Sequence, residues 1–365
     1  MNKCYHSGMY VLDYLYRYQN IDFKEVPFNE VDALVLAMVS YFPFDELKDQ
    51  KEIYSSDELL KRINEYKPPK NSGERKLNYI EVVKIICRSL RFKHAKFAWF
   101  KKERDVVNSK QFQAITIILH DFAYVSFCGT DSTTLGWKED FNMAYLDTVP
   151  SEIEAVRYLQ DVSYNFVFKK MYVGGHSKGG RLAITSAKRL NKSYKLLGVY
   201  SFDAPNYPQN CYDTEYKSIL HLLREYTPDE SIIGRLMNEY REKKIISSCN
   251  GLLLQHDAFS WDIEGHEFVR KQAYTPRSTH IVDTMNYALN NYDEEMKKDF
   301  IDGIFDFLTN IDVEKLPNER ELLPFFAKRL KLIRDEWKNT PKEKRAVFWK
   351  MLFNLSKDYL LKKKD

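Results

Sequence analysis

The spacing of hydrophobic residues changes along the chain, and its first part predicts helices. Tyr10, Tyr14 and Tyr18 recur four residues apart, which is the spacing of one face of a helix. Residues 31–40 are apolar nearly all round, so they predict a helix that is buried inside the protein. A further helix is predicted over residues 78–90.

The pattern then becomes that of strands. Residues 113–119 and 122–128 are apolar and rich in β-branched side chains, and only two polar residues separate them. So short a break predicts an antiparallel hairpin. A second hairpin is predicted from residues 245–248 and 252–255, which flank the turn-forming pair Asn250-Gly251.

Between the two predicted hairpins, helices and strands alternate. A helix is predicted over 151–166, a strand just before Ser177, a helix over 181–190, and strands over 195–202 and 220–226. Strands that alternate with helices form a mostly parallel sheet with helices on both faces. The sequence therefore predicts the α/β class.

Three segments follow from this order. We expect a helical N-terminal segment over residues 1–110, an α/β core over 111–283, and a helical C-terminal segment over 284–365. Three prolines separate the predicted C-terminal helices: Pro317, Pro324 and Pro341.

Composition and charge exclude several classes of protein. The net charge of +4 is small for 365 residues and argues against a nucleic-acid binder. No hydrophobic run approaches the roughly 18 to 20 residues that span a bilayer. We expect that the first twenty residues are not a signal peptide. Five cysteines occur without Cys-x-x-Cys or metal-ligand spacing, so we expect reduced thiols, a cytoplasmic location, and no metal or cofactor. These cysteines are Cys4, Cys87, Cys128, Cys211 and Cys249.

The C-terminal region is basic. Residues 315–365 hold fifteen Lys and Arg against seven Asp and Glu, a net charge of +8. Solvated helix faces are the favoured interpretation. The alternative is a patch that contacts an anionic membrane surface or acidic substrates.

The most informative short stretch is Gly-x-Ser-x-Gly, with Gly175, Ser177 and Gly179 in its fixed positions. A predicted strand precedes it and a predicted helix follows it, as in the nucleophile elbow of α/β-hydrolases. Glycines are needed because the chain and the helix pass close to the serine. The alternative is a glycine-rich turn with a buried serine.

A serine nucleophile requires a base, which follows it in this fold. Four histidines do so. His256 is favoured, because it comes directly after a predicted strand. His221 lies inside a predicted strand and is expected in the core, whereas His266 and His280 lie in loops beside helices.

The acid should lie between the serine and the base, at a strand end. Asp203 and Asp229 both occupy such a position. Asp203 is the preferred acid, and Asp229 remains the alternative. The oxyanion hole needs two N–H donors. We expect these to be the backbone N–H of Lys178 and a donor from Thr130, while the Lys178 side chain points to solvent or to a substrate head group.

Several motifs resemble a known group. Residues 125–130 (VSFCGT), with Trp137 and Asp140, resemble the F-R-G-T…W…D stretch of the class 3 lipases, and 175–180 (GHSKGG) resembles their elbow. A closer resemblance is to an uncharacterised bacterial family of class-3-lipase-like α/β-hydrolases. The shared motifs are PFNEVDALVL (27–36), GTD (129–131), GWKEDFNMA (136–144), GHSKGG (175–180), DxP (203–205), SIxG (231–234) and QHDxxSW (255–261).

The resemblance implies an α/β-hydrolase fold, with Ser177 as nucleophile, His256 as base and Thr130 in the oxyanion hole. It supports Asp203 through the D-x-P motif, although Asp229 aligns better with the acid of the fungal enzymes. Cys128 departs from the pattern, because the lipases have arginine there.

Two functions follow. The first is a serine hydrolase that cleaves small-molecule acyl, lipid-like esters through a Ser-His-Asp triad and an acyl-enzyme. The alternative is a catalytically silent module of the same fold that docks to a membrane or a partner through its basic C-terminal helices.

Overall fold

The structure is a computed structural model, and it describes residues 8–70, 72–131, 133–166, 169–291, 293–310, 313 and 328–339. Its helices are α1 (Val11–Tyr18), α2 (Glu30–Met38), α3 (Ser56–Glu65), α4 (Glu74–Arg88), α5 (Thr134–Asn142), α6 (Pro150–Asn165), α7 (Lys178–Lys188), α8 (Thr214–Ser218), α9 (Pro276–Asn291), α10 (Glu294–Asn310) and α12 (Leu330–Asn339). Its strands are β1 (Ile53–Ser55), β2 (Lys96–Asp105), β3 (Lys110–Ile118), β4 (Ala123–Phe127), β5 (Met171–His176), β6 (Leu196–Phe202), β7 (Leu223–Pro228), β8 (Lys244–Ile246), β9 (Ile263–Glu264) and β10 (Glu267–Phe268).

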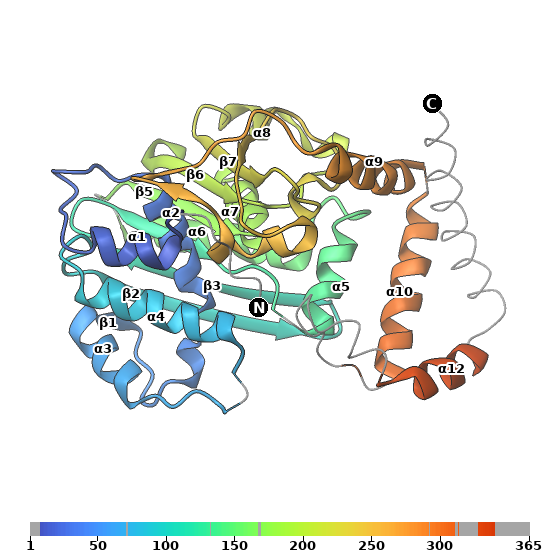
Figure 1. The fold of residues 1–365 in the computed structure, drawn as a ribbon, viewed down its shortest axis with the longest axis horizontal. Coiled ribbons are helices and arrows are strands. Elements are labelled where there is room, and N and C mark those ends of the chain that lie inside the picture. The colour runs from blue at the N-terminus through green and yellow to red at the C-terminus, as the bar shows by residue number, and fades with distance from the viewer. Residues whose placement is uncertain are drawn as a thin grey trace.

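The centre of the fold is a sheet of eight strands among the described residues, in the order β1 to β8 (Figure 1). The strands β1 to β4 pair antiparallel, whereas β4 to β8 pair parallel. The predicted hairpin is confirmed, because Ile118 of β3 pairs with Ala123 of β4. Together with the helices, this mostly parallel sheet is an α/β-hydrolase fold, as expected.

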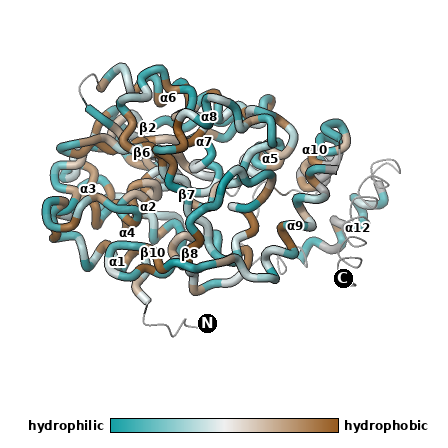
Figure 2. Tube along the Cα trace, turned by 90° about the horizontal axis from the view of Figure 1, so that it is seen from above, coloured by the Kyte–Doolittle hydropathy of each residue, from teal (hydrophilic) through white to brown (hydrophobic). Residues whose placement is uncertain are grey.

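Helices cover both faces of the sheet, because successive side chains of a strand point to opposite faces. On β4, Tyr124 packs with the N-terminal helices, whereas the adjacent Val125 packs with α6 and α7. The helix predicted over 31–40 is confirmed as buried, since every residue of α2 after Glu30 is buried. Hydrophobic segments accordingly gather in the middle of the molecule, around α2 and the strands (Figure 2).

The helix α7 lies close against the sheet. Ala183 and Ala187 are fully buried in the same cluster as Val173 of β5. At position 180, a Cβ atom would lie 2.8 Å from the Cβ of Ala204, so Gly180 also permits the close approach. The first turn of α7 is thereby held at the carboxyl edge of the parallel strands.

The structure differs from the expected segments in two places. The strands β1 and β2 belong to the central sheet, although residues 1–110 were expected to be helical. The second predicted hairpin is wrong, because residues Leu252–His256 form a 3₁₀ helix. Ser248 instead pairs with Trp261, beyond that helix. The physical reason is that Gln255 is buried and its side chain makes three hydrogen bonds, which an exposed hairpin strand could not provide.

The C-terminal segment is helical where the structure describes it, in α9, α10 and α12. The three prolines and most of the basic stretch 315–365 lie outside the described residues. None of the described helices has the length and hydrophobicity needed to cross a membrane.

Candidate active site

Ser177 occupies the turn between β5 and α7, and its backbone is strained. Its φ is +58° and its ψ is −135°, a conformation that non-glycine residues rarely adopt. The Ser177 N–H donates to the Phe202 carbonyl of β6 over 2.8 Å, which holds the turn against the sheet. Strain of this kind persists only where surrounding contacts enforce it, and it gathers at functional sites.

Two glycines make room for this turn. At position 175, a Cβ atom would lie 2.3 Å from the carbonyl carbon of Gly179. At position 179, a Cβ atom would lie 2.1 Å from the carbonyl oxygen of Phe127, at the end of β4. Both separations are far below van der Waals contact, so the expected reason for the glycines is confirmed.

Three of the candidate residues lie in one hydrogen-bonded chain. His256 Nε2 lies 2.9 Å from Ser177 Oγ, and His256 Nδ1 lies 2.6 Å from Asp203 Oδ2. Asp203 is fully buried just beyond β6, and the Ser231 hydroxyl donates to its second oxygen over 2.6 Å. A Cβ atom on Gly234 would lie 2.0 Å from that oxygen, so the glycine leaves room for the carboxylate.

The other candidates lie elsewhere. Asp229 accepts a hydrogen bond from the side-chain amide of Gln255, the residue before His256. Its bond is thus with the neighbour of the candidate base and not with the imidazole ring. His266 lies exposed in the turn between β9 and β10, and His280 lies in α9. The expectation that His221 belongs to a core strand is wrong, because β7 begins at Leu223 and His221 is exposed in the turn before it.

The loop that carries His256 is held mainly by hydrogen bonds of neutral groups, apart from the Asp229 carboxylate that accepts from Gln255. The buried Trp261 indole donates to the Gln255 carbonyl over 2.8 Å. The Gln255 side chain accepts from the Glu230 N–H over 2.7 Å. His176 Nε2 lies 2.8 Å from the His256 carbonyl oxygen. The Q-H-D-x-x-S-W motif thus contains both the candidate base and residues that orient it.

His176 is a neutral link between two parts of the site. Its Nε2 faces a carbonyl oxygen and must carry the proton, so Nδ1 accepts from the Tyr41 hydroxyl over 3.1 Å. Burial, and then the proximity of His256, hold the pKa of His176 well below its usual range. No pattern in the sequence pointed to Tyr41, which lies 135 residues before His176 and in no recognised motif.

The segments that carry the predicted oxyanion donors lie next to Ser177. A Cβ atom on Gly129 would lie 3.1 Å from the Ser177 Cβ, so the end of β4 directly borders the serine. The next residue, Thr130, donates its hydroxyl to the Asp140 carboxylate in α5. Lys178 is the first residue of α7, and an N–H at this position has no partner within the helix.

The expected orientation of the Lys178 side chain is wrong. Lys178 is only 1% exposed, and its ammonium group is buried under α5. Its Nζ lies 2.9 Å from Glu139 Oε2, 2.9 Å from the Gln111 carbonyl oxygen and 2.7 Å from Gln111 Oε1. These partners come from β3 and α5, so the sequence around the elbow could not reveal them.

Asp140 has an altered acidity. Burial raises the pKa of its carboxyl to about 6, although the Lys178 charge and the Thr130 hydroxyl both lower it. Its Oδ1 is buried without a hydrogen-bond partner and lies 3.8 Å from Lys178 Nζ. The raised pKa brings this carboxyl closer to neutral pH than an ordinary aspartate.

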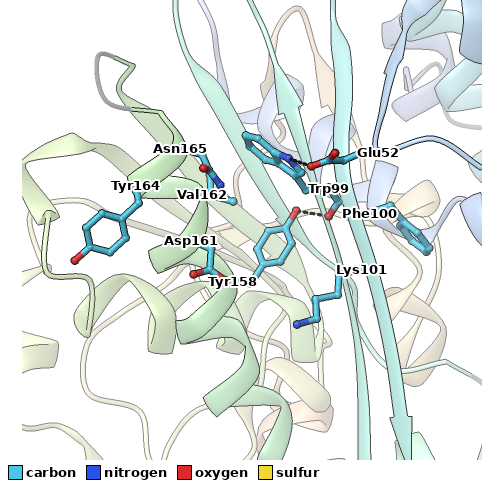
Figure 3. Close-up of a pocket in the computed structure, with 9 residues that line it drawn as sticks. All are labelled: Glu52, Trp99, Phe100, Lys101, Tyr158, Asp161, Val162, Tyr164 and Asn165. Atoms are coloured by element: carbon cyan, nitrogen blue, oxygen red, sulfur yellow. Dashed lines mark hydrogen bonds between the residues drawn. The ribbon is translucent and has the colours of Figure 1, made fainter.

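A separate pocket of about 510 Å³ lies between β2 and α6 (Figure 3). Trp99 lies at its wall with a positive φ of 55°, and its indole donates to the Glu52 carboxylate over 2.9 Å. The Tyr158 hydroxyl donates to the Trp99 carbonyl. None of the residues that line this pocket belongs to the Ser177 site.

Among the described residues, no group of three or more His, Cys, Asp or Glu side chains forms a candidate metal site.

A comparison of the sequence with models of known protein families identifies the family of the chain. The model of the Mbeg1-like family matches residues 86–306, which is more than half of the chain. The chain belongs to the Mbeg1-like family. The match includes Ser177, Asp203 and His256, and it begins after Tyr41. It agrees with the lipase-like resemblance of the motifs.

Several solved structures are similar to this Mbeg1-like chain. The nonglycosylated LIP2 lipase of Yarrowia lipolytica is 13% identical, with a TM-score of 0.37 over 64% of this chain and 93% of its own. MDLA from Penicillium cyclopium, in a mutant form, is 12% identical, with a TM-score of 0.39 over 66% and 84%. The Rhizomucor miehei lipase, in complex with its propeptide, is 16% identical, with a TM-score of 0.33 over 45% and 59%. Because these scores are low, the assignment of the fold depends on the central sheet and the turn at Ser177 and not on these structures. Among the curated proteins, none matches the chain.

Proposed function

We propose that this Mbeg1-like protein is a serine hydrolase that cleaves acyl esters through Ser177, His256 and Asp203. The observation that carries the proposal is the hydrogen-bonded chain from Asp203 through the His256 ring to Ser177 Oγ. The strained serine at a strand-to-helix turn supports it independently.

The reaction follows from these positions. His256 Nε2 takes the proton of Ser177 Oγ as that oxygen attacks the ester carbonyl carbon. The carbonyl oxygen becomes an anion, which would accept from the backbone N–H groups of Lys178 and Thr130. Asp203 holds the imidazole in the correct tautomer and stabilises its cation. The imidazolium then protonates the departing alcohol, which leaves an ester of the acyl group with Ser177. A water molecule, deprotonated by His256, attacks this ester; the acid is released and Ser177 regains its proton.

The proposed substrates are lipid-like esters, because the motifs at 125–130 and 175–180 resemble those of the class 3 lipases. Cleavage of a thioester or an amide would use the same residues. Rates with p-nitrophenyl esters of increasing acyl length, compared with thioester and anilide analogues, would identify the preferred class.

A fluorophosphonate probe tests the proposal, because it reacts covalently with an activated serine. We expect labelling of the wild-type protein and none of Ser177→Ala. Ser186→Ala is the matched control, since Ser186 is a buried serine of the same helix that bonds only the Ala183 carbonyl. Labelling of the wild type no stronger than that of Ser177→Ala would overturn the proposal and favour the silent binding module.

That alternative has its own test. A silent module would bind anionic vesicles through the basic stretch 315–365. Deletion of this stretch should then abolish vesicle binding. Unchanged binding would exclude this version of the alternative.

A further inference from the structure

Lys178 contributes to the site with both its backbone and its side chain. Its backbone N–H lies at the start of α7, directly after Ser177. Its side chain extends away from the serine, and its three contacts with Gln111 and Glu139 match the three N–H bonds of an ammonium group. No proton of this group is left for a substrate.

Glu139 connects this ammonium group to three other elements. It is fully buried in α5. Its Oε1 accepts from the Ser151 N–H at the start of α6, over 2.9 Å. Its Oε2 accepts from the Gln111 N–H of β3, over 3.0 Å, as well as from Lys178. The carboxylate therefore holds α5 to β3, α6 and α7.

The residue after Glu139 is Asp140, which accepts the Thr130 hydroxyl. Because the two residues are consecutive in one helix, fixing Glu139 also fixes the acceptor of Thr130. The opposite side of α5 packs on α10 (Figure 1). There, Lys138 Nζ lies 2.8 Å from Asp302, and the rings of Phe141 and Phe305 lie 5.8 Å apart. The helix α5 is thus held from both sides.

We propose that Lys178 is a positioning residue for the oxyanion site: through Glu139 its ammonium group holds α5 and Asp140, so that Thr130 is already in place before substrate binds. This inference rests on the proposed function of Ser177. It also has a kinetic consequence, because an oxyanion site that is already formed does not have to be assembled at a lipid–water interface. Dissolved monomeric esters should then be hydrolysed as readily as aggregated ones.

The first experiment removes the ion pair without leaving a buried charge. Replacing both partners of a buried pair is often neutral for stability, whereas removing one is not. The variant is Lys178→Met together with Glu139→Gln, which keeps an acceptor for the Ser151 N–H. The matched control is Lys188→Met with Asp213→Asn, a lysine–carboxylate pair of 2.9 Å at the far end of α7.

We expect the Lys178 and Glu139 double variant to fold, with kcat reduced about 10²- to 10³-fold, the usual effect of losing one oxyanion donor. KM should stay within about threefold, since the contacts that bind the ester ground state are retained. The acid limb of its pH profile should also move to higher pH. The lost Lys178 charge lowers the pKa of Asp140 more than the lost Glu139 charge raises it, so the pKa of this carboxyl should rise. A folded double variant with the kcat of the control would overturn the proposal.

A second experiment needs no variant. The rate of the wild-type protein is measured with an ester at concentrations below and above the point where the ester aggregates. We expect a hyperbolic dependence without a break, and a jump in rate at that point would overturn the preformed site. A wild-type protein that does not react with the fluorophosphonate probe would instead overturn the proposed function, so the two failures are distinguishable.

Discussion

The two walls beside Ser177 are built from different kinds of contact. The wall that carries His256 is held mainly by hydrogen bonds of neutral groups: the His176 ring, the Trp261 indole and the Gln255 amide. Its ion pair, Arg75 with Asp257, is partly exposed. The wall that carries Thr130 is held by buried charges, with Lys178 against Glu139. Neutral hydrogen bonds contribute modestly and do not titrate, whereas a buried ion pair couples its elements strongly and is costly to break.

The difference suits what each wall is proposed to do. In the proposed mechanism His256 gains a positive charge, and a second cation beside it would oppose that step. The ring of His176 lies only 4.7 Å from that of His256, and its lowered pKa keeps it neutral. The Thr130 wall is proposed to stabilise an anion through N–H donors, and the ion pair of Lys178 with Glu139 is proposed to hold those donors in place.

The largest expected effect distinguishes the two candidate acids of the His256 wall. Asp203→Asn should lower kcat about 10⁴-fold, because the imidazole would be held in the wrong tautomer. Asp229→Asn is the matched control and should change kcat less than tenfold, because Asp229 contacts only the Gln255 amide near the base. Steady-state kinetics with one p-nitrophenyl ester measures both. Equal losses would remove Asp203 from the proposed triad.

The next effect tests the cost of breaking the charged wall. Lys178→Met alone leaves the Glu139 carboxylate buried without its cation, which should lower the free energy of unfolding by about 3–5 kcal/mol. Urea unfolding followed by circular dichroism measures this loss. Adding Glu139→Gln should recover most of it. A single variant as stable as the wild type would show that the pair does not hold α5.

A smaller effect concerns pH. The pKa of Asp140 is raised to about 6, so the carboxyl gains a proton as the pH falls through about 6. A neutral acid accepts the Thr130 hydroxyl less strongly than a carboxylate does, and activity should therefore fall on the acid side. Asp140→Asn is neutral at every pH. Its kcat/KM at pH 8 should be about five- to tenfold below wild type, as expected for losing a charge-assisted bond.

The pH profile supplies the control for this variant. The ionisation near pH 6 that belongs to Asp140 should be missing from the profile of Asp140→Asn. An acid limb identical to that of the wild type would show that Asp140 does not influence the reaction.

The smallest effect is expected on the neutral wall. Tyr41→Phe removes the donor to His176 Nδ1 and leaves a buried acceptor unsatisfied, which should cost about 1–3 kcal/mol of stability. We expect kcat to fall less than about fivefold at every pH, because His256 also keeps its bonds to Asp203 and Ser177. Thermal unfolding and a pH–rate profile test this. A change in the acid limb would contradict a neutral role for this wall.

The sequence by itself determined the local features. The elbow depends on residues within five positions of each other, and a backbone turn this tight permits only glycine at 175 and 179. The hairpin of β3 and β4 and the buried α2 likewise follow from short-range patterns. The α/β class follows because alternating helices and strands have few ways to pack.

Only the tertiary structure decided the contacts between distant segments. Asp203 and Asp229 both lie at strand ends on one edge of the sheet, and the position of the His256 ring separates them. The direction of the Lys178 side chain depends on Gln111 and Glu139, which lie 67 and 39 residues away along the chain. A side chain takes the orientation that satisfies its charge among its neighbours in space, and the residues beside it in sequence do not determine those neighbours.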